Sequence, residues 1–290
     1  MVVIQNILRG ELPTSIDPVW LSLAPLLAFN VAIMVAFFFF TITYVGRVKN
    51  EDVDLKEHSR FLSRHFKEFW YWMTSPVEKL LIKFHVAPNL LTLGGFLISC
   101  ISSYLFHKGM VGAGGWIMIF GATFDMFDGR IARLTGQASK SGAFFDSVMD
   151  RFGEAVVFLG LASYYRSTWV LPYVVLALVG SLMVSYTRAR GEGVGVDVKT
   201  GVMQRPERIV YLGVGSIFSP IVSYFLSPFL KVPFDFLTVG AILLIAVMTN
   251  FTAFYRIRYI IRHLNPVDSG SRPQSRFLAR LIHRWNNLGS

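Results

Sequence analysis

Four aspartates lie in two long apolar segments, 111–133 and 142–164, that are expected to form neighbouring helices. They are Asp125, Asp128, Asp146 and Asp150. The members of each pair are three or four residues apart, so each pair lies on one face of its helix. In an antiparallel hairpin of these helices, Asp128 would lie at the same depth as Asp146, and Asp125 at the same depth as Asp150. Both pairs would be roughly 6–14 Å from the end at which the helices are connected.

Carboxylates that converge in this way could bind divalent metal ions. Four such groups at one depth cannot all remain ionised unless cations lie close to them. Mg²⁺ and Mn²⁺ prefer oxygen ligands, and four aspartates are enough to hold two such ions in a shared site. Helix packing explains the aspartates poorly, because charged groups inside membrane spans are costly and usually mark function.

The aspartates form part of a longer pattern with fixed small and basic positions, D-x2-D-G-x2-A-R-x8-G-x3-D-x3-D over 125–150. Gly129 would let a ligand approach the backbone closely, and Arg133 could pair with an anionic group. Gly142 is expected to open the second helix, where free N–H groups favour an anion. Close helix packing is an alternative role for Gly129, Ala132 and Gly142, and interface anchoring is an alternative for Arg133.

This pattern resembles, at all eight fixed positions, the signature of the CDP-alcohol phosphotransferase family. The resemblance implies an enzyme with a six-helix membrane bundle preceded by an amphipathic helix, over about 57–260. It implies that Asp125, Asp128, Asp146 and Asp150 bind two divalent cations, Mg²⁺ or Mn²⁺. It further implies that Asp150 is the catalytic base, which accepts a proton from an attacking hydroxyl, and that the protein is a homodimer.

Upstream of the motif, residues 88–92 (PNLLT) begin the preceding apolar segment. This run resembles the Pro-Asn-x-x-Thr start of the same family, in which polar residues face the nucleotide. Initiation of a helix by proline and a polar cap explains the run equally well. Six residues are thus candidates for binding the CDP-lipid: Asn89, Thr92, Gly129, Ala132, Arg133 and Gly142.

The elements that position these residues are expected to be membrane-spanning helices. Of 290 residues, 53% are hydrophobic and only 16% are charged, which excludes disorder and an ordinary water-soluble enzyme. The single cysteine, Cys100, excludes an intrachain disulfide framework. Seven segments are long and apolar enough to span a bilayer: 19–45, 89–106, 111–133, 142–164, 170–190, 207–229 and 235–257. The expected fold class is all-α, a polytopic membrane bundle with a six-helix core and one extra N-terminal span.

The basic residues predict how the bundle is oriented. A formal charge of +10 on so apolar a chain favours a membrane protein with cationic faces over a nucleic-acid binder. Of the Lys and Arg residues, only Arg9, Lys108, Arg166 and Lys231 are expected on the N-terminal side of the membrane. The positive-inside rule then places the N-terminus outside and the C-terminus in the cytosol. The active site would face the cytosol from the cytoplasmic membrane.

Two basic stretches rich in aromatic residues, at about 57–75 and 276–285, are expected to be amphipathic helices on anionic lipid. The predicted organisation has an N-terminal span with a linker, a juxtamembrane helix, a catalytic membrane domain and a basic tail. Their ranges are 1–56, 57–87, 88–260 and 261–290.

A cluster of cations within 185–208 indicates the class of the acceptor alcohol. Its members are Arg188, Arg190, Lys199, Arg205 and Arg208. Arginines at two facing helix ends suit bidentate capture of a phosphate. The general excess of positive charge on the cytosolic side is an alternative explanation, for Lys199 in particular. The segment resembles that of phosphatidylinositol-phosphate synthases, which implies inositol phosphate as the acceptor.

The sequence therefore predicts a transferase that moves the phosphatidyl group of CDP-diacylglycerol, or of CDP-archaeol, to a phosphorylated polyol and releases CMP. Glycerol 3-phosphate is the nearest alternative acceptor, and a neutral alcohol is another. A carboxylate-based ion transporter is a distant alternative, because its acids should lie near the bilayer midplane on broken helices.

Overall fold

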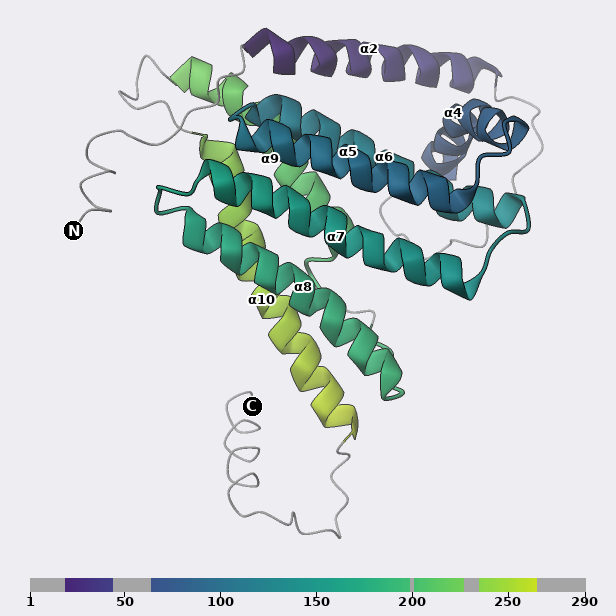
Figure 1. Ribbon diagram of the computed structural model, residues 1–290. Coiled ribbons are helices and arrows are strands. Elements are labelled where there is room, and N and C mark those ends of the chain that lie inside the picture. Colours follow the sequence, from purple (N-terminus) through teal and green to yellow (C-terminus); the bar gives the residue numbers. More distant parts are fainter. Residues whose placement is uncertain (1–18, 44–63, 199–200, 227–234, 265–290) are drawn as a thin grey trace, which may run out of the picture.

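The computed structural model describes residues 19–43, 64–198, 201–226 and 235–264. Within these ranges the chain forms eight α-helices and no strand (Figure 1). The helices are α2 (Val19–Thr43), α4 (Arg64–Lys83), α5 (Pro88–His107), α6 (Val111–Leu134), α7 (Lys140–Tyr164), α8 (Leu171–Gly193), α9 (Arg205–Leu226) and α10 (Phe236–Leu264). The all-α fold class predicted from the sequence is confirmed.

Six of the helices, α5 to α10, pack into one bundle. α5 lies against α6 and α7, α9 lies against α6 and α10, and α8 runs along α10 (Figure 1). Helices that follow one another in the chain through short connections run antiparallel. The starts of α5, α7 and α9 therefore meet the ends of α6, α8 and α10, and the motif residues lie at this end of the bundle.

Five of the described helices, α2, α5, α8, α9 and α10, are long and apolar enough to cross a membrane. The chain is therefore an integral membrane protein. α6 and α7 have similar lengths, 24 and 25 residues, but they carry the charged residues of the motif. The count of seven spans made from the sequence stays a prediction for these two helices.

α2 and α4 lie outside the six-helix bundle and contact each other. The rings of Phe40 in α2 and Phe69 in α4 are both 1% exposed, with centroids 5.5 Å apart. Trp72 of α4 also packs on Phe40. Part of the aromatic stretch that was expected to lie on lipid is thus covered by α2. The C-terminal amphipathic helix and residues 57–63 fall outside the described residues, and the predicted domain boundaries stay predictions.

Glycines allow two pairs of bundle helices to approach closely. A Cβ added to Gly115 of α6 would lie 2.8 Å from the carbonyl oxygen of Gly213 in α9. A Cβ added to Gly160 of α7 would collide with the carbonyl oxygen of Ser103 in α5. Small residues at such crossings let membrane helices pack backbone to backbone. These contacts fix where the motif-bearing helices α6 and α7 sit.

We expect Gly160→Ala to lower the free energy of unfolding by about 1–3 kcal/mol, because the new methyl group must displace backbone. The measurement is thermal or denaturant unfolding of the purified protein in detergent. Gly94→Ala is the matched control, since a Cβ added at Gly94 in α5 would meet no neighbouring atom within 4 Å apart from the adjacent backbone of its own helix. Equal stability of the two variants would contradict the close α5–α7 contact.

Candidate active site

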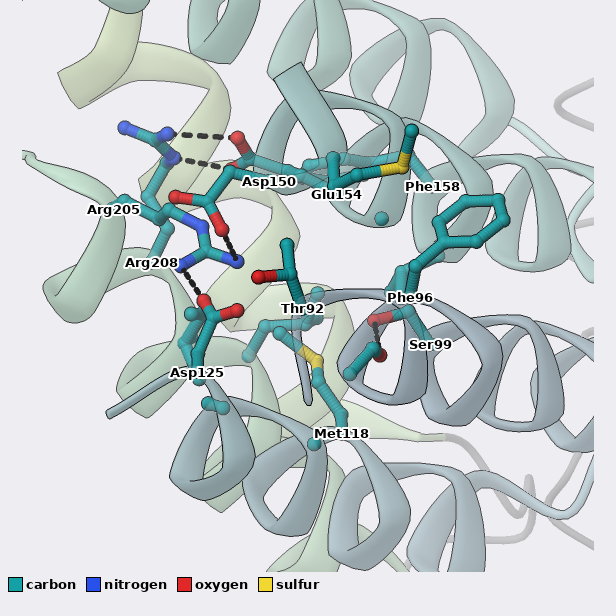
Figure 2. A pocket seen from close by; sticks show the side chains of 18 residues that line it. Thr92, Phe96, Ser99, Met118, Asp125, Asp150, Glu154, Phe158, Arg205 and Arg208 are labelled. Carbon is teal, nitrogen blue, oxygen red and sulfur yellow. Dashed lines mark hydrogen bonds and ion pairs between the residues drawn. The ribbon is translucent and has the colours of Figure 1, made fainter. Parts of the chain in front are cut away.

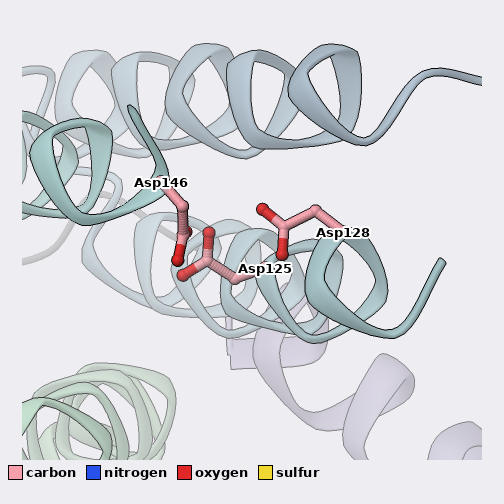
Figure 3. A group of neighbouring side chains, drawn as sticks. All are labelled: Asp125, Asp128 and Asp146. Atoms are coloured by element: carbon pink, nitrogen blue, oxygen red, sulfur yellow. The ribbon is translucent and has the colours of Figure 1, made fainter. Parts of the chain in front are cut away.

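Three of the four motif aspartates form one group. Asp125 and Asp128 come from α6 and Asp146 comes from α7 (Figure 3). One carboxylate oxygen of each lies within 4.8 Å of the others. Asp128 is only 4% exposed. Three carboxylates at this spacing form a donor set that fits Mg²⁺ or Mn²⁺, which take hard oxygen ligands.

The carboxylate of Asp128 is held by two neighbours. The hydroxyl of Thr92, in α5, donates a hydrogen bond of 2.6 Å to Asp128 Oδ2. The backbone N–H of Gly129 donates to the other oxygen, Oδ1. Thr92 and Gly129 were predicted to contact the CDP-lipid, but in the structure they also fix the orientation of a candidate metal ligand.

Asp150 lies next to the group of three and is attached to it through an arginine. Arg205 Nη2 is 2.9 Å from Asp150 Oδ1, and Arg205 Nη1 is ion-paired with Asp125 Oδ2 (Figure 2). Four carboxylates at one depth were expected from the helical spacing. The structure gathers three of them and links the fourth to Asp125 by a guanidinium from α9, which the spacing could not show.

A cavity of about 320 Å³ opens beside the three aspartates, at the start of α5 and α7 and the end of α6. We call it the glycine-lined cavity, after Gly129 and Gly142. All six residues predicted to bind the CDP-lipid line it: Asn89, Thr92, Gly129, Ala132, Arg133 and Gly142. Asp128 and Asp146 form part of its wall. The structure thus brings the six candidates together, although they come from three helices.

The start of α7 differs in detail from the prediction. Gly142 was expected to open the helix, but α7 begins at Lys140 and Ser139 is its N-cap. The N–H of Gly142 donates to Ser139 Oγ at 3.1 Å, so this donor is already used by the cap. At α5, Pro88 does begin the helix, and no side chain caps it. Helix initiation by Pro88 is thus confirmed, the expected polar cap is absent, and Asn89 lies in the wall of the glycine-lined cavity.

A second cavity, of about 530 Å³, lies between α7, α8, α9 and α10. Five arginines line it, and we call it the arginine-lined cavity: Arg151, Arg188, Arg205, Arg208 and Arg256. Asp146 and Asp150 form its wall on the side of the aspartate group. Asp146 borders both cavities, so the two spaces meet at the carboxylates. Figure 2 looks into a smaller space beneath them, which Asp125, Asp150 and Arg205 also line.

The cations predicted for the acceptor are only partly brought together. Arg188, Arg205 and Arg208 line the arginine-lined cavity. Arg190 is exposed and does not line it, because neighbouring positions on a helix face different directions. Lys199 lies outside the described residues.

Two arginines of this cavity were missed in the sequence. Arg151 follows Asp150 directly, and this adjacency was the signal that could have found it. Arg256 lies near the end of the last apolar segment, where an arginine is ordinarily an interface anchor. In the structure it is 2% exposed and its Nη1 donates to the carbonyl oxygen of Val184 at 2.7 Å. Only the packing of α8 on α10 turns it toward the cavity.

Known proteins are similar to this chain in sequence and in fold. The chain is 38% identical to an archaetidylinositol phosphate synthase of Pyrococcus horikoshii over 146 residues, which are 50% of this chain and 77% of that protein. It is 31% identical to a phosphatidylinositol phosphate synthase of Cutibacterium acnes over 151 residues, 50% of this chain and 73% of that one.

Crystal structures of Mycobacterium tuberculosis phosphatidylinositol phosphate synthase have the same fold. The form in complex with manganese and citrate gives a TM-score of 0.58 at 28% identity, over 65% of this chain and 88% of that one. The form with CDP-DAG bound gives a TM-score of 0.56 at 29% identity, over 64% and 92%. Residues 85–261, which include the motif, α5 to α9 and most of α10, match the CDP-alcohol phosphatidyltransferase family. The chain belongs to the CDP-alcohol phosphatidyltransferase family.

Proposed function

We propose that the protein transfers the phosphatidyl group of CDP-diacylglycerol, or of its archaeol counterpart, to the hydroxyl of inositol phosphate and releases CMP. The observation that carries this proposal is the meeting of two cavities at one set of aspartates, one lined by small residues and one by five arginines. The relatives named as phosphatidylinositol or archaetidylinositol phosphate synthases support it.

The glycine-lined cavity suits the CDP portion of the lipid. The absence of side chains at Gly129 and Gly142 gives room beside the backbone, and Arg133 lines the cavity with a guanidinium that can pair with phosphate. Asp125, Asp128 and Asp146 would hold the divalent cations, Mg²⁺ or Mn²⁺, of which two are expected. Bound there, the cations supply the positive charge that neutralises the pyrophosphate. The manganese in a similar protein supports this assignment.

Asp150 is the proposed base of the transfer. It lines the arginine-lined cavity, so its carboxylate can accept the proton of an acceptor hydroxyl bound there. The hydroxyl oxygen then attacks the phosphorus nearest the lipid, a new P–O bond forms, and the P–O bond to CMP breaks. Holding donor and acceptor in adjoining cavities aligns the attacking and leaving oxygens on opposite sides of that phosphorus.

The charge of the second cavity favours an acceptor that carries its own phosphate. Carboxylates of Asp146, Asp150, Glu154 and Glu192 also line the cavity and offset part of its positive charge. Guanidinium groups bind phosphate oxygens in bidentate fashion, and free inositol or another neutral alcohol offers them no anion. We assign phosphate binding to Arg188, Arg205, Arg208 and the two additional arginines Arg151 and Arg256. Glycerol 3-phosphate is the second candidate, because its phosphate would meet the same five groups.

An acceptor screen tests this function directly. Purified protein is supplied with CDP-diacylglycerol and Mg²⁺ or Mn²⁺, and CMP release is measured with inositol phosphate, glycerol 3-phosphate and free inositol. We expect release with inositol phosphate and little with free inositol. Preferential use of glycerol 3-phosphate would favour the second candidate, and preferential use of free inositol would contradict an anionic acceptor. Absence of CMP release with every acceptor would favour the transporter alternative.

We expect Arg188→Gln to raise the acceptor KM about tenfold, as loss of a charge-assisted contact with phosphate predicts. The KM for CDP-diacylglycerol should change less than about twofold, because Arg188 lies on the acceptor side. Arg190→Gln is the matched control, since Arg190 is on the same turn of α8 but outside the cavity. Steady-state kinetics of CMP release give both constants. Equal effects of the two variants would contradict the assignment of Arg188.

The orientation proposed for the bundle places its motif end in the cytosol. Support comes from the distribution of Lys and Arg, most of which fall on the side of the 134–141 connection. The N-terminus would then be outside and the C-terminus inside, in the cytoplasmic membrane. A cysteine introduced at Gln137, with Cys100 replaced, should react with an impermeant thiol reagent only in inverted vesicles. The homodimer implied by the family resemblance stays a prediction.

A further inference from the structure

A buried ion pair joins α7 to α9 one helical turn below the proposed base. Arg208 Nε and Nη2 face the two oxygens of Glu154, at 2.5 and 2.8 Å (Figure 2). The side chains are 2% and 10% exposed. Nothing in the motif includes Glu154, and the mechanism described above does not use it.

This pair and the Asp150–Arg205 pair form two rungs between the same helices. Glu154 follows Asp150 by four residues on α7, and Arg208 follows Arg205 by three on α9, so each set shares a helical face. The upper rung, Asp150–Arg205, lies at the aspartate group, with side chains 19% and 31% exposed. The lower rung lies deeper and is bidentate. Its geometry therefore restricts the register and rotation of α9 against α7.

The lower rung also fixes how Arg208 faces the acceptor. A guanidinium has five N–H donors. In Arg208, Nε and Nη2 each donate to Glu154, and Nη1 donates to the carbonyl oxygen of Met203 at 3.3 Å. The plane of the group is thus held from two sides, and Arg208 so held lines the arginine-lined cavity.

Resting on the proposed function, we infer that Glu154 is a positioning residue for the acceptor, acting through Arg208. Its carboxylate sets the plane of the Arg208 guanidinium and, through the register of α9, keeps Arg205 opposite Asp150. Buried ion pairs are weak contributors to net stability, since apolar replacements of both partners are often as stable. A defined geometry at the acceptor cavity is the property that this pair supplies.

The test is Glu154→Gln, which keeps the shape of the side chain and removes its charge. We expect the acceptor KM to rise about tenfold or more, as for loss of a hydrogen bond between charged groups. The KM for CDP-diacylglycerol should stay within about twofold, because the glycine-lined cavity is built from α5, α6 and the start of α7. Glu154→Asp, which keeps the charge, should restore part of the acceptor affinity.

Glu78→Gln is the matched control. Glu78 pairs with Arg130 at 3.0 Å between α4 and α6, with side chains 5% and 21% exposed, and neither residue lines the cavities described above. This variant should lower the unfolding temperature without a selective change in the acceptor KM. A selective acceptor effect of the same size in Glu78→Gln would show that loss of any buried pair suffices, and would overturn the inference.

A double-mutant cycle shows whether Glu154 acts through Arg208. In an Arg208→Gln background, adding Glu154→Gln should change the acceptor KM less than about twofold. The inference would be overturned if the effects of the two substitutions on the acceptor KM multiplied. It would also be overturned if the KM values for the acceptor and for CDP-diacylglycerol rose equally. If Glu154→Gln does not fold, the double variant decides, since it leaves no unpaired buried charge: a wild-type acceptor KM there would overturn the inference. All ratios use whichever anionic acceptor the wild-type protein accepts, so failure with inositol phosphate counts against the proposed function alone.

Discussion

Replacing Asp150 by Asn should lower the rate of CMP release about 10²–10⁴-fold, the range that a general base contributes. The asparagine side chain has the same shape and can remain beside Arg205, but it cannot accept the proton of the acceptor hydroxyl. The fold and the affinity for CDP-diacylglycerol should stay near wild-type values. The measurements are turnover at saturating substrates and metal, together with binding of the CDP-lipid.

Glu207→Gln serves as the control for this variant. Glu207 is also acidic and lies on the first turn of α9, but it lines none of the described cavities and accepts a hydrogen bond from the N–H of Gln204. A near-normal rate in Asp150→Asn would exclude Asp150 as the base. Weaker Mn²⁺ binding by Asp150→Asn would show that Asp150 also contributes to metal binding, as the family resemblance implies.

Removal of divalent cations should abolish transfer, and addition of Mg²⁺ or Mn²⁺ should restore it. The physical reason is the charge of the group formed by Asp125, Asp128 and Asp146, which would otherwise repel the pyrophosphate of the substrate. EDTA treatment followed by titration of each metal, with CMP release as the readout, gives the dependence.

The same site predicts the effect of single substitutions. Asp128→Asn and Asp146→Asn should each raise the Mn²⁺ concentration for half-maximal rate about tenfold or more, since one charge-assisted ligand is lost. Thr92→Val should have a smaller effect in the same direction, about threefold to tenfold, because it removes only the hydrogen bond that orients Asp128. Mn²⁺ affinity measured by electron paramagnetic resonance is independent of activity. Full activity after EDTA treatment would contradict a metal-dependent site.

The motif aspartates and the CDP-lipid candidates could be predicted because their relations are local. The i, i+3 and i, i+4 spacing of the aspartates fixes a shared helical face in any helix. A short connection between α6 and α7 then makes the two faces neighbours, so Asp128 and Asp146 converge as expected. Asn89 and Thr92 lie near these aspartates because the start of α5 is at the same end of the bundle.

The residues of the arginine-lined cavity were harder to predict from the sequence, because they come together only through contacts between segments far apart in the chain. Arg188 and Arg190 are two positions apart on α8, yet only Arg188 lines the cavity. The helical period separates their directions, but the rotation of α8 against α10 decides which of them points inward. Arg256 reaches the same cavity from the other end of the chain for the same reason.

The sequence by itself determined the family, the all-helical membrane fold and the aspartates that can carry the chemistry, because these follow from composition and local spacing. The tertiary structure decided that Arg205 bridges Asp125 and Asp150 and that Glu154 holds Arg208. Those contacts depend on how closely α7, α6 and α9 approach and how each is rotated. Close packing at positions such as Gly115 and Gly213 sets that approach, and helical periodicity along one segment carries no information about it.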